Sequence, residues 1–262
     1  MTENPNPTQS PAVDGVVDVT GTPTDVAPVD SGRLVVAVDG PSGSGKSSVS
    51  KQVARSLGAV YLDTGAMYRA AAWHCVNEGV DLDDAQAVTE AVREMELTQS
   101  TDPDVEHVAV GGHDVTEAIR TPEVTAVVSQ VACIVPVREI LQGRQRDEIE
   151  RAGRIVAEGR DVTTVVAPDA EARVLLTASE QVRMARRSGQ LTAAASGVDA
   201  ETLKAQVAGR DRTDSAHSSF ERPADGVALV DSSELDFDQT VAAVLAAVQQ
   251  QAGAPAVEGP RP

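Results

Sequence analysis

The chain has 262 residues, a formal net charge of −18 and a sequence pI of about 4.5. This acidic balance excludes binding to nucleic acid by bulk charge attraction, because phosphate backbones require clustered Lys and Arg. Hydrophobic residues make up 41% of the chain but aromatic residues only 2%, so a core has to be built from Ala, Val, Leu and Ile. The length suits one α/β domain with a small appendage, or at most two domains.

Residues 1–32 are expected to form a disordered, acidic, Pro-rich tail, because they contain no aromatic residue and no Lys or Arg. A second disordered tail is predicted over residues 253–262, which leaves one domain over residues 33–252. No apolar run approaches the roughly 20 residues of a membrane helix, and no basic cluster precedes an apolar stretch near the start. We therefore expect a cytoplasmic monomer that binds neither membrane nor nucleic acid.

The first predicted element is a strand over residues 34–38, a continuous apolar run typical of a buried parallel strand. Glycines and serines follow, and residues 46–57 then place apolar side chains at helical spacing. Gly58 is expected to end this helix in a left-handed conformation. Residues 60–62 predict the next strand. A β-α-β unit of this kind indicates a parallel sheet with helices on both faces.

Later segments extend this pattern. Thr121 followed by Pro122 predicts a helix with Thr as its cap and Pro at its first position, and Pro136 is expected to open another helix. Residues 97–115 differ, because valines alternate with polar residues around two glycines, which predicts a small antiparallel insertion. Further buried strands are predicted over residues 155–157, 174–176 and 227–230, and a last helix over residues 238–250.

Residues 40–47 match the phosphate-binding pattern G-x-x-x-x-G-K-[ST] in full, between a predicted strand and a predicted helix. Glycines let backbone N–H groups curl around phosphate oxygens, and the helix directs its positive end at them. We expect Lys46 to contact the β- and γ-phosphates of ATP and the Ser47 hydroxyl to ligate Mg²⁺. The candidate cofactor-binding residues are Gly40, Pro41, Ser42, Gly43, Ser44, Gly45, Lys46, Ser47 and Ser48.

The loop alone does not distinguish a kinase from a GTPase or a motor. The guanine-reading pattern N-K-x-D does not occur, and a large motor ATPase would normally show an acidic strand end and be longer. Arginines outside the loop are more informative, because bidentate guanidinium groups suit the positioning and charge neutralisation that phosphoryl transfer needs. Those near predicted strand ends and helix starts are Arg69, Arg138, Arg160, Arg183, Arg186, Arg187, Arg210 and Arg212.

Four further motifs resemble the bacterial cytidylate kinases, which are P-loop nucleoside monophosphate kinases. Residues 63–69, D-T-G-A-M-Y-R, are similar to that family's L-D-[ST]-G-x-x-Y-R segment. Residues 129–132 with Arg138 resemble its S-x-V-A…V-R stretch, residues 159–166 its G-R-D-x-G-T-V-V motif, and residues 210–215 its R-D-x-x-D-S motif. The resemblance extends, with gaps, from about residue 34 to about residue 231.

The resemblance implies ATP-dependent phosphorylation of CMP and dCMP on an α/β fold of the P-loop NTPase type. That fold has a parallel sheet flanked by helices, an acceptor-binding insertion at about residues 93–128 and a mobile lid at about residues 183–215. The residues matching Thr64, Arg69 and Arg160 hold the acceptor phosphate in the family. Those matching Ser129, Arg138 and Asp161 read the cytosine ring, since a carboxylate suits its amine and a guanidinium its acceptors.

The resemblance also places Arg210 and Asp214 against the acceptor phosphate and ribose. It places Arg183, Arg186 and Arg187 on the helix that enters the lid, over the transferred phosphoryl group. No general base is expected, because the attacking phosphate oxygen is already anionic. The candidate catalytic residues are Lys46, Arg160, Arg183, Arg187 and Arg210.

Two positions depart from the family pattern. His217 stands where the family usually has Arg, and neutral His is a poorer phosphate clamp. Thr163 stands where the family has Gly, so its side chain is expected either to crowd the acceptor site or to be tolerated by the backbone. The alternatives left open are a P-loop kinase for another small acceptor, such as a different nucleotide or a sugar acid, and a nucleotide-binding regulator without turnover.

Overall fold

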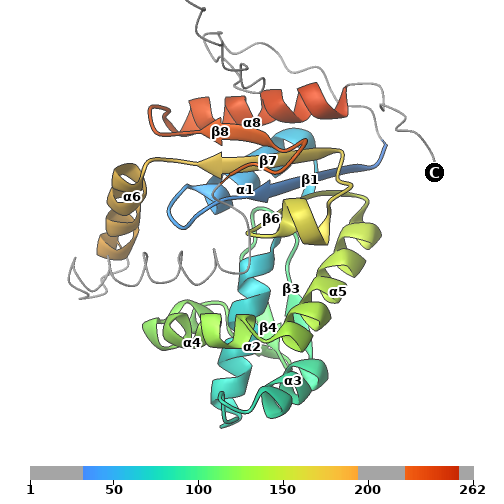
Figure 1. Ribbon diagram of the computed structural model, residues 1–262, viewed down its shortest axis with the longest axis vertical. Helices are drawn as coiled ribbons and strands as arrows, with labels where there is room; N and C mark the ends of the chain where they lie inside the picture. The colour runs from blue at the N-terminus through green and yellow to red at the C-terminus, as the bar shows by residue number, and fades with distance from the viewer. Residues whose placement is uncertain (1–31, 194–221, 254–262) are drawn as a thin grey trace, which may run out of the picture.

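The computed structural model describes residues 32–193 and 222–253. The predicted tails and most of the predicted lid lie outside these residues. Within them, a parallel sheet has the strand order β2-β6-β1-β7-β8 (Figure 1). Its strands are β1 (Leu34–Asp39), β2 (Val60–Asp63), β6 (Arg154–Gly159), β7 (Ala172–Thr177) and β8 (Ala228–Asp231). The buried strands predicted from apolar runs are thus confirmed.

Strand β1 lies between β6 and β7 and is buried along its whole length. Its last residue, Asp39, pairs in register with Gly159 at the end of β6. The loop after β1 and the segment after β6 therefore leave the sheet side by side, at its carboxyl edge. This is where α/β proteins place their ligands.

Helices cover both faces of the sheet, as predicted. On one face α1 (Lys46–Leu57) and α8 (Phe237–Ala252) pack on β1, β6, β7 and β8 through valines, alanines and leucines. On the other face α5 (Val135–Ala152) and a short π-helical segment, η2 (Val162–Val166), pack on β1, β2 and β6. Gly58 ends α1 in the left-handed conformation, with φ +58°.

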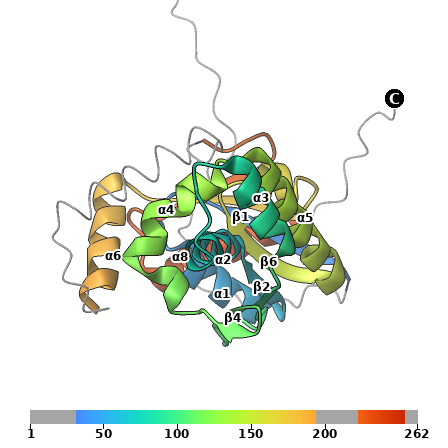
Figure 2. The same ribbon diagram turned by 90° about the horizontal axis from the view of Figure 1, so that it is seen from below.

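A second apolar cluster lies beyond β2 and surrounds α2 (Thr64–Asn77). Figure 2 shows α2 nearly end-on, with α3 (Ala85–Glu94), α4 (Pro122–Ala132), α5 and β4 around it. The predicted antiparallel insertion is a three-stranded sheet of β3 (Leu97–Gln99), β4 (Val108–Val110) and β5 (His113–Asp114), followed by the short helix η1 (Ala118–Arg120). This insertion shares its apolar residues with α2.

Helix α4 begins at Pro122 with Thr121 at the cap position, as predicted, but the Thr121 side chain makes no capping hydrogen bond. Pro at the first turn needs no donor of its own, so the helix start depends less on a cap. After β7 the chain forms α6 (Glu180–Ala193), which stands at the edge of the molecule in Figure 1. Among the described helices none can cross a bilayer alone, and only α4 with α5, bent by 101°, reaches the required length and apolarity as a pair.

Candidate active site

The loop between β1 and α1 needs glycine at two close approaches. A Cβ on Gly40 would lie 2.0 Å from the carbonyl oxygen of Leu176 at the end of β7. A Cβ on Gly43, which has φ +79°, would lie 2.6 Å from the carbonyl oxygen of Arg183 on α6. Helix α1 then starts with no side-chain cap and no acidic residue in its first turn. Its first N–H groups are therefore suited to receive an anion.

A cleft opens in front of this loop and continues to α2, η1 and the end of β6. It joins most of the predicted phosphate-binding residues with Asp63, the first residue of the D-T-G-A-M-Y-R motif, and with Glu158, which no motif singled out. Its walls are formed by Ser42, Gly43, Gly45, Lys46, Ser47, Ser48, Asp63, Gly65, Arg69, Arg120, Glu158, Gly159 and Arg160. Cationic groups thus meet from four separate parts of the chain, and two carboxylates, Asp63 and Glu158, line the same cleft.

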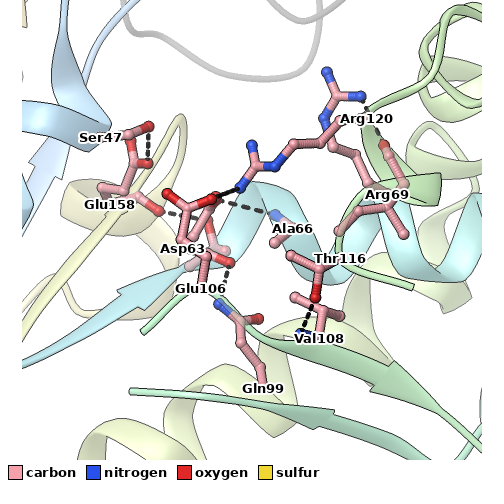
Figure 3. Close-up of polar contacts among 12 residues, drawn as sticks. Ser47, Asp63, Ala66, Arg69, Gln99, Glu106, Val108, Thr116, Arg120 and Glu158 are labelled. Atoms are coloured by element: carbon pink, nitrogen blue, oxygen red, sulfur yellow. Dashed lines mark hydrogen bonds and ion pairs between the residues drawn. The ribbon is translucent and has the colours of Figure 1, made fainter. Parts of the chain in front are cut away.

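Glu158, at the end of β6, is the buried carboxylate of this cleft, with 3% of its surface exposed. The Ser47 hydroxyl donates a hydrogen bond to its Oε1 over 2.5 Å (Figure 3). The Tyr61 hydroxyl donates to the same oxygen over 2.9 Å. Burial raises the pKa of the Glu158 carboxyl above its usual range, Asp63 adds to the rise, and Lys46 opposes it. The side chain of Ser47, in the phosphate-binding loop, is thus held against the Glu158 carboxyl group at the end of β6.

Asp63 and Thr64 join β2 to α2 beside Glu158. The Asp63 carboxylate caps α2 by accepting from the Ala66 N–H over 3.0 Å. The Thr64 hydroxyl is buried and donates to the Glu158 carbonyl oxygen over 2.8 Å. Because this bond uses the hydroxyl proton, a phosphate contact by Thr64 would require the hydroxyl to turn away from Glu158.

Arg69 and Arg160 face the same cleft from α2 and from the end of β6. Arg69 is held by hydrogen bonds from its Nη1 to the Ile119 carbonyl oxygen, over 3.1 Å, and to the Thr125 hydroxyl, over 2.9 Å. The two predicted phosphate-binding arginines are thus brought together with Lys46. Gly159, just before Arg160, has no room for a side chain, because a Cβ there would lie 2.4 Å from the Thr64 hydroxyl oxygen.

The predicted base-reading residues are only partly brought together. Arg138 on α5 forms an ion pair with Asp161, with 2.7 Å between Nη2 and Oδ2, and the Asp161 side chain is 7% exposed. Gln142, which no motif identified, also donates to Asp161 Oδ2, over 2.9 Å. Its position one turn after Arg138 on the same helix could have suggested it. Ser129 is half-buried on α4, and no hydrogen bond joins its side chain to this pair within the described residues.

Helix α6 is tied to the phosphate-binding loop by two arginines. Arg183 Nη1 donates to the Ser42 carbonyl oxygen over 3.0 Å, and Arg186 Nη1 donates to that of Ser44 over 3.1 Å. Arg186 also bonds the hydroxyl and the carbonyl oxygen of Ser232, both over 3.0 Å. The expectation that Arg186 covers the transferred phosphoryl is therefore revised, because backbone carbonyls occupy its guanidinium. The Arg187 side chain, Arg210, Asp214 and His217 lie outside the described residues.

Thr163 does not crowd the cleft. Its side chain is buried, and its hydroxyl donates to Asp39 Oδ2 over 2.6 Å, while the N–H groups of Val162 and Thr163 donate to Asp39 over 3.0 and 2.8 Å. Burial raises the pKa of the Asp39 carboxyl, and these three donors oppose the rise. Of the two outcomes expected for Thr163, the backbone accommodates it.

These features define a class of protein. A glycine-rich loop follows the central strand of a parallel sheet, and a cleft lined with Lys and Arg opens in front of it, which is the arrangement of a P-loop phosphotransferase. A sequence model described as cytidylate kinase matches residues 36–250. The chain therefore belongs to the cytidylate kinase family and is a nucleoside monophosphate kinase that binds nucleotide substrates.

Curated relatives agree with this assignment. The chain is 47% identical to the cytidylate kinase of Rhodococcus opacus over 86% of this chain and 99% of that protein. It is 47% identical to the cytidylate kinase of Nocardia farcinica over 83% of this chain and 94% of that protein. It is 46% identical to the cytidylate kinase of Corynebacterium glutamicum over 80% of this chain and 92% of that protein.

Proposed function

We propose that this chain transfers the γ-phosphoryl group of ATP to CMP and dCMP, which yields ADP with CDP or dCDP. The observation that carries the proposal is the cleft that joins Lys46 and Ser47 of the loop to Arg69 and Arg160. The next residue, Asp161, pairs with Arg138. The proposed phosphate-binding arginine, Arg160, and the proposed base-reading carboxylate, Asp161, are thus neighbours in the chain.

The residues divide the work of an in-line transfer. The loop N–H groups and Lys46 hold the donor phosphates, while Arg69 and Arg160 hold the acceptor phosphate. An anionic oxygen of the acceptor phosphate forms a bond to the γ-phosphorus as the bond to the β-γ bridging oxygen breaks, and ADP leaves. No proton has to be removed, so positioning and charge neutralisation supply the catalysis.

The oxygen-bearing side chains at this site suit Mg²⁺. The Ser47 hydroxyl lies against the Glu158 carboxylate, and Asp63 is next to them, so hard oxygen donors converge on one side of the loop. No cluster of three or more His, Cys, Asp or Glu side chains that could hold a metal occurs within the described residues. Magnesium typically takes one or two carboxylates and completes its shell with water and substrate phosphates. When bound, it would neutralise charge on the donor phosphates.

Base selection is assigned to Asp161 and Arg138. Within the described residues both hydrogen bonds to Asp161 arrive at Oδ2, which leaves Oδ1 to accept from the exocyclic amine of cytosine. The Arg138 guanidinium can donate to ring O2 and N3. Uracil lacks the amine and presents an N–H at position 3, so it would leave the buried carboxylate without its donor.

The test is coupled measurement of ADP release with CMP, dCMP, UMP, AMP, GMP and shikimate as acceptors. We expect CMP and dCMP to be the best acceptors and Lys46→Ala to reduce their turnover by at least about 10²-fold, the size typical of losing a charge-stabilising group at the reacting centre. UMP or shikimate as the best acceptor would support the alternative kinase. ATP binding without any acceptor-dependent ADP release would support the regulator. Either result would overturn the proposal.

A further inference from the structure

Arg120 lies in the wall of the cleft, although no sequence motif singled it out. It is the last residue of η1 and follows the three-stranded insertion, so it reaches the cleft from a part of the chain that supplies none of the predicted phosphate-binding residues. Figure 3 shows its side chain extended toward Asp63 and beside Arg69. The same cleft is lined by Lys46 and Arg160.

The ion pairs of Arg120 are long, and both involve a single guanidinium nitrogen. Its Nη2 lies 3.4 Å from Glu106 Oε2 and 3.9 Å from Asp63 Oδ2. Within the described residues its Nε and Nη1 donors have no partner. The side chain is 44% exposed, and ion pairs at that exposure contribute little to stability. The two carboxylates therefore hold the guanidinium in place without using most of its donors.

The supports of Arg120 are themselves fixed. Glu106 also binds Lys51 of α1, and that contact, together with the charge of Arg120, lowers the pKa of the Glu106 carboxyl, so this support is ionised at neutral pH. The carbonyl oxygen of Ile119, the preceding residue, accepts from Arg69 Nη1 over 3.1 Å. One backbone segment thus positions Arg69 and Arg120 together.

We propose that Arg120 binds the phosphate of the acceptor nucleotide, as a third guanidinium beside Arg69 and Arg160. This inference rests on the proposed phosphoryl transfer and adds a residue from the insertion to it. A phosphate dianion has three terminal oxygens and accepts several charge-assisted hydrogen bonds at once. The negative charges of Asp63 and Glu106 offset the repulsion between Arg120 and the two arginines beside it, Arg69 and Arg160.

The experiment compares Arg120→Gln with Arg55→Gln. Arg55 on α1 is the matched control, because it binds the loop between β3 and β4, which also carries Glu106, but does not line the cleft. Its guanidinium donates to Asp104 Oδ1 over 2.7 Å and to the Pro103 carbonyl oxygen over 3.0 Å. We expect Arg120→Gln to raise the KM of the best acceptor roughly 10- to 100-fold, the loss typical of hydrogen bonds to a charged group, with the KM of ATP changed less than about threefold. Arg55→Gln should leave both values near wild type.

Arg120→Lys separates phosphate binding from folding. It keeps the charge but loses the bidentate fork, so its acceptor KM should lie between those of wild type and Arg120→Gln. The inference would be overturned if a folded Arg120→Gln variant kept the acceptor KM of wild type. It would also be overturned if Arg120→Gln and Arg55→Gln raised the acceptor KM and the ATP KM equally. If Arg120→Gln does not fold, the same criteria apply to Arg120→Lys. The proposed function is judged separately, by the wild-type acceptor panel.

Discussion

Glu158 stands at the centre of the site, yet no motif identified it. It directly follows the predicted strand over residues 155–157 and directly precedes the motif that begins at Gly159. The structure buries its carboxylate against Ser47 and Tyr61, with Lys46 close enough to oppose the rise in its pKa. A carboxylate that ends a buried parallel strand beside a phosphate-binding loop is the signal that could have found it.

Glu158→Gln is expected to separate stability from activity. Because burial raises the folded-state pKa of Glu158, its contribution to stability is greatest below the ordinary Glu pKa of about 4.3 and falls as pH rises through the higher folded value. Gln does not titrate, so the stability of the variant relative to wild type should increase from about pH 4.5 to pH 8 in urea unfolding. Turnover should fall at least about 10²-fold, because Ser47 loses the carboxyl group to which its hydroxyl donates.

The control for this change is Glu150→Gln, since Glu150 is an exposed carboxylate paired with Arg33 far from the cleft. A constant stability difference between Glu158→Gln and wild type across that pH range would contradict the assigned pKa shift. Turnover equal to wild type would contradict the role of Glu158 at the site.

At the scale of elements, the segment η2 connects the two halves of the active site. It begins directly after Arg160 and Asp161, and its first residues are bonded to Asp39, which directly precedes the phosphate-binding loop. One buried carboxylate therefore sets the distance between the donor loop and the acceptor residues. This connection spans more than a hundred residues of sequence, so local pattern could not reveal it.

Thr163→Val is expected to loosen this connection. It keeps the shape of Thr but removes the hydroxyl that donates to Asp39, so the buried carboxylate loses one of its three donors. The free energy of unfolding should fall by about 1–3 kcal/mol, measured by chemical denaturation, and the acceptor KM should rise. Thr163→Ser retains the donor and should stay close to wild type. A loss in Thr163→Ser with none in Thr163→Val would show that the methyl group, not the hydroxyl, matters.

At the scale of the molecule, the sequence was sufficient for what depends on neighbouring residues. The buried strands, the helix after the glycine-rich loop and the antiparallel insertion all follow from local periodicity and turn residues, and the structure confirms them. The strand order β2-β6-β1-β7-β8 and the pairing of Asp39 with Thr163 depend on contacts distant in sequence. The same limit explains why the sequence did not predict the contacts of Arg186. A motif gives the position of a residue on a helix but not the carbonyl oxygens of distant segments that its side chain bonds.

Arg186 links three distant parts of the chain, which makes it a test of how the whole molecule holds its phosphate-binding loop. Its guanidinium bonds the Ser44 carbonyl oxygen in that loop and the hydroxyl and carbonyl oxygen of Ser232 after β8. Arg186→Gln cannot span these acceptors, so we expect the free energy of unfolding to fall by about 2–4 kcal/mol. The KM of ATP should rise more than that of the acceptor, because the loop binds the donor.

Arg186→Lys provides the matched control, since one ammonium group keeps the charge but cannot reach three acceptors in a fork. If charge alone mattered, the Lys variant would behave as wild type. If the fork matters, it should lose most of the stability lost by Arg186→Gln. A fall in turnover with an unchanged free energy of unfolding would contradict the structural role and support the first expectation, that Arg186 covers the transferred phosphoryl group. Steady-state kinetics in both substrates, together with urea unfolding of each variant, decides between these outcomes.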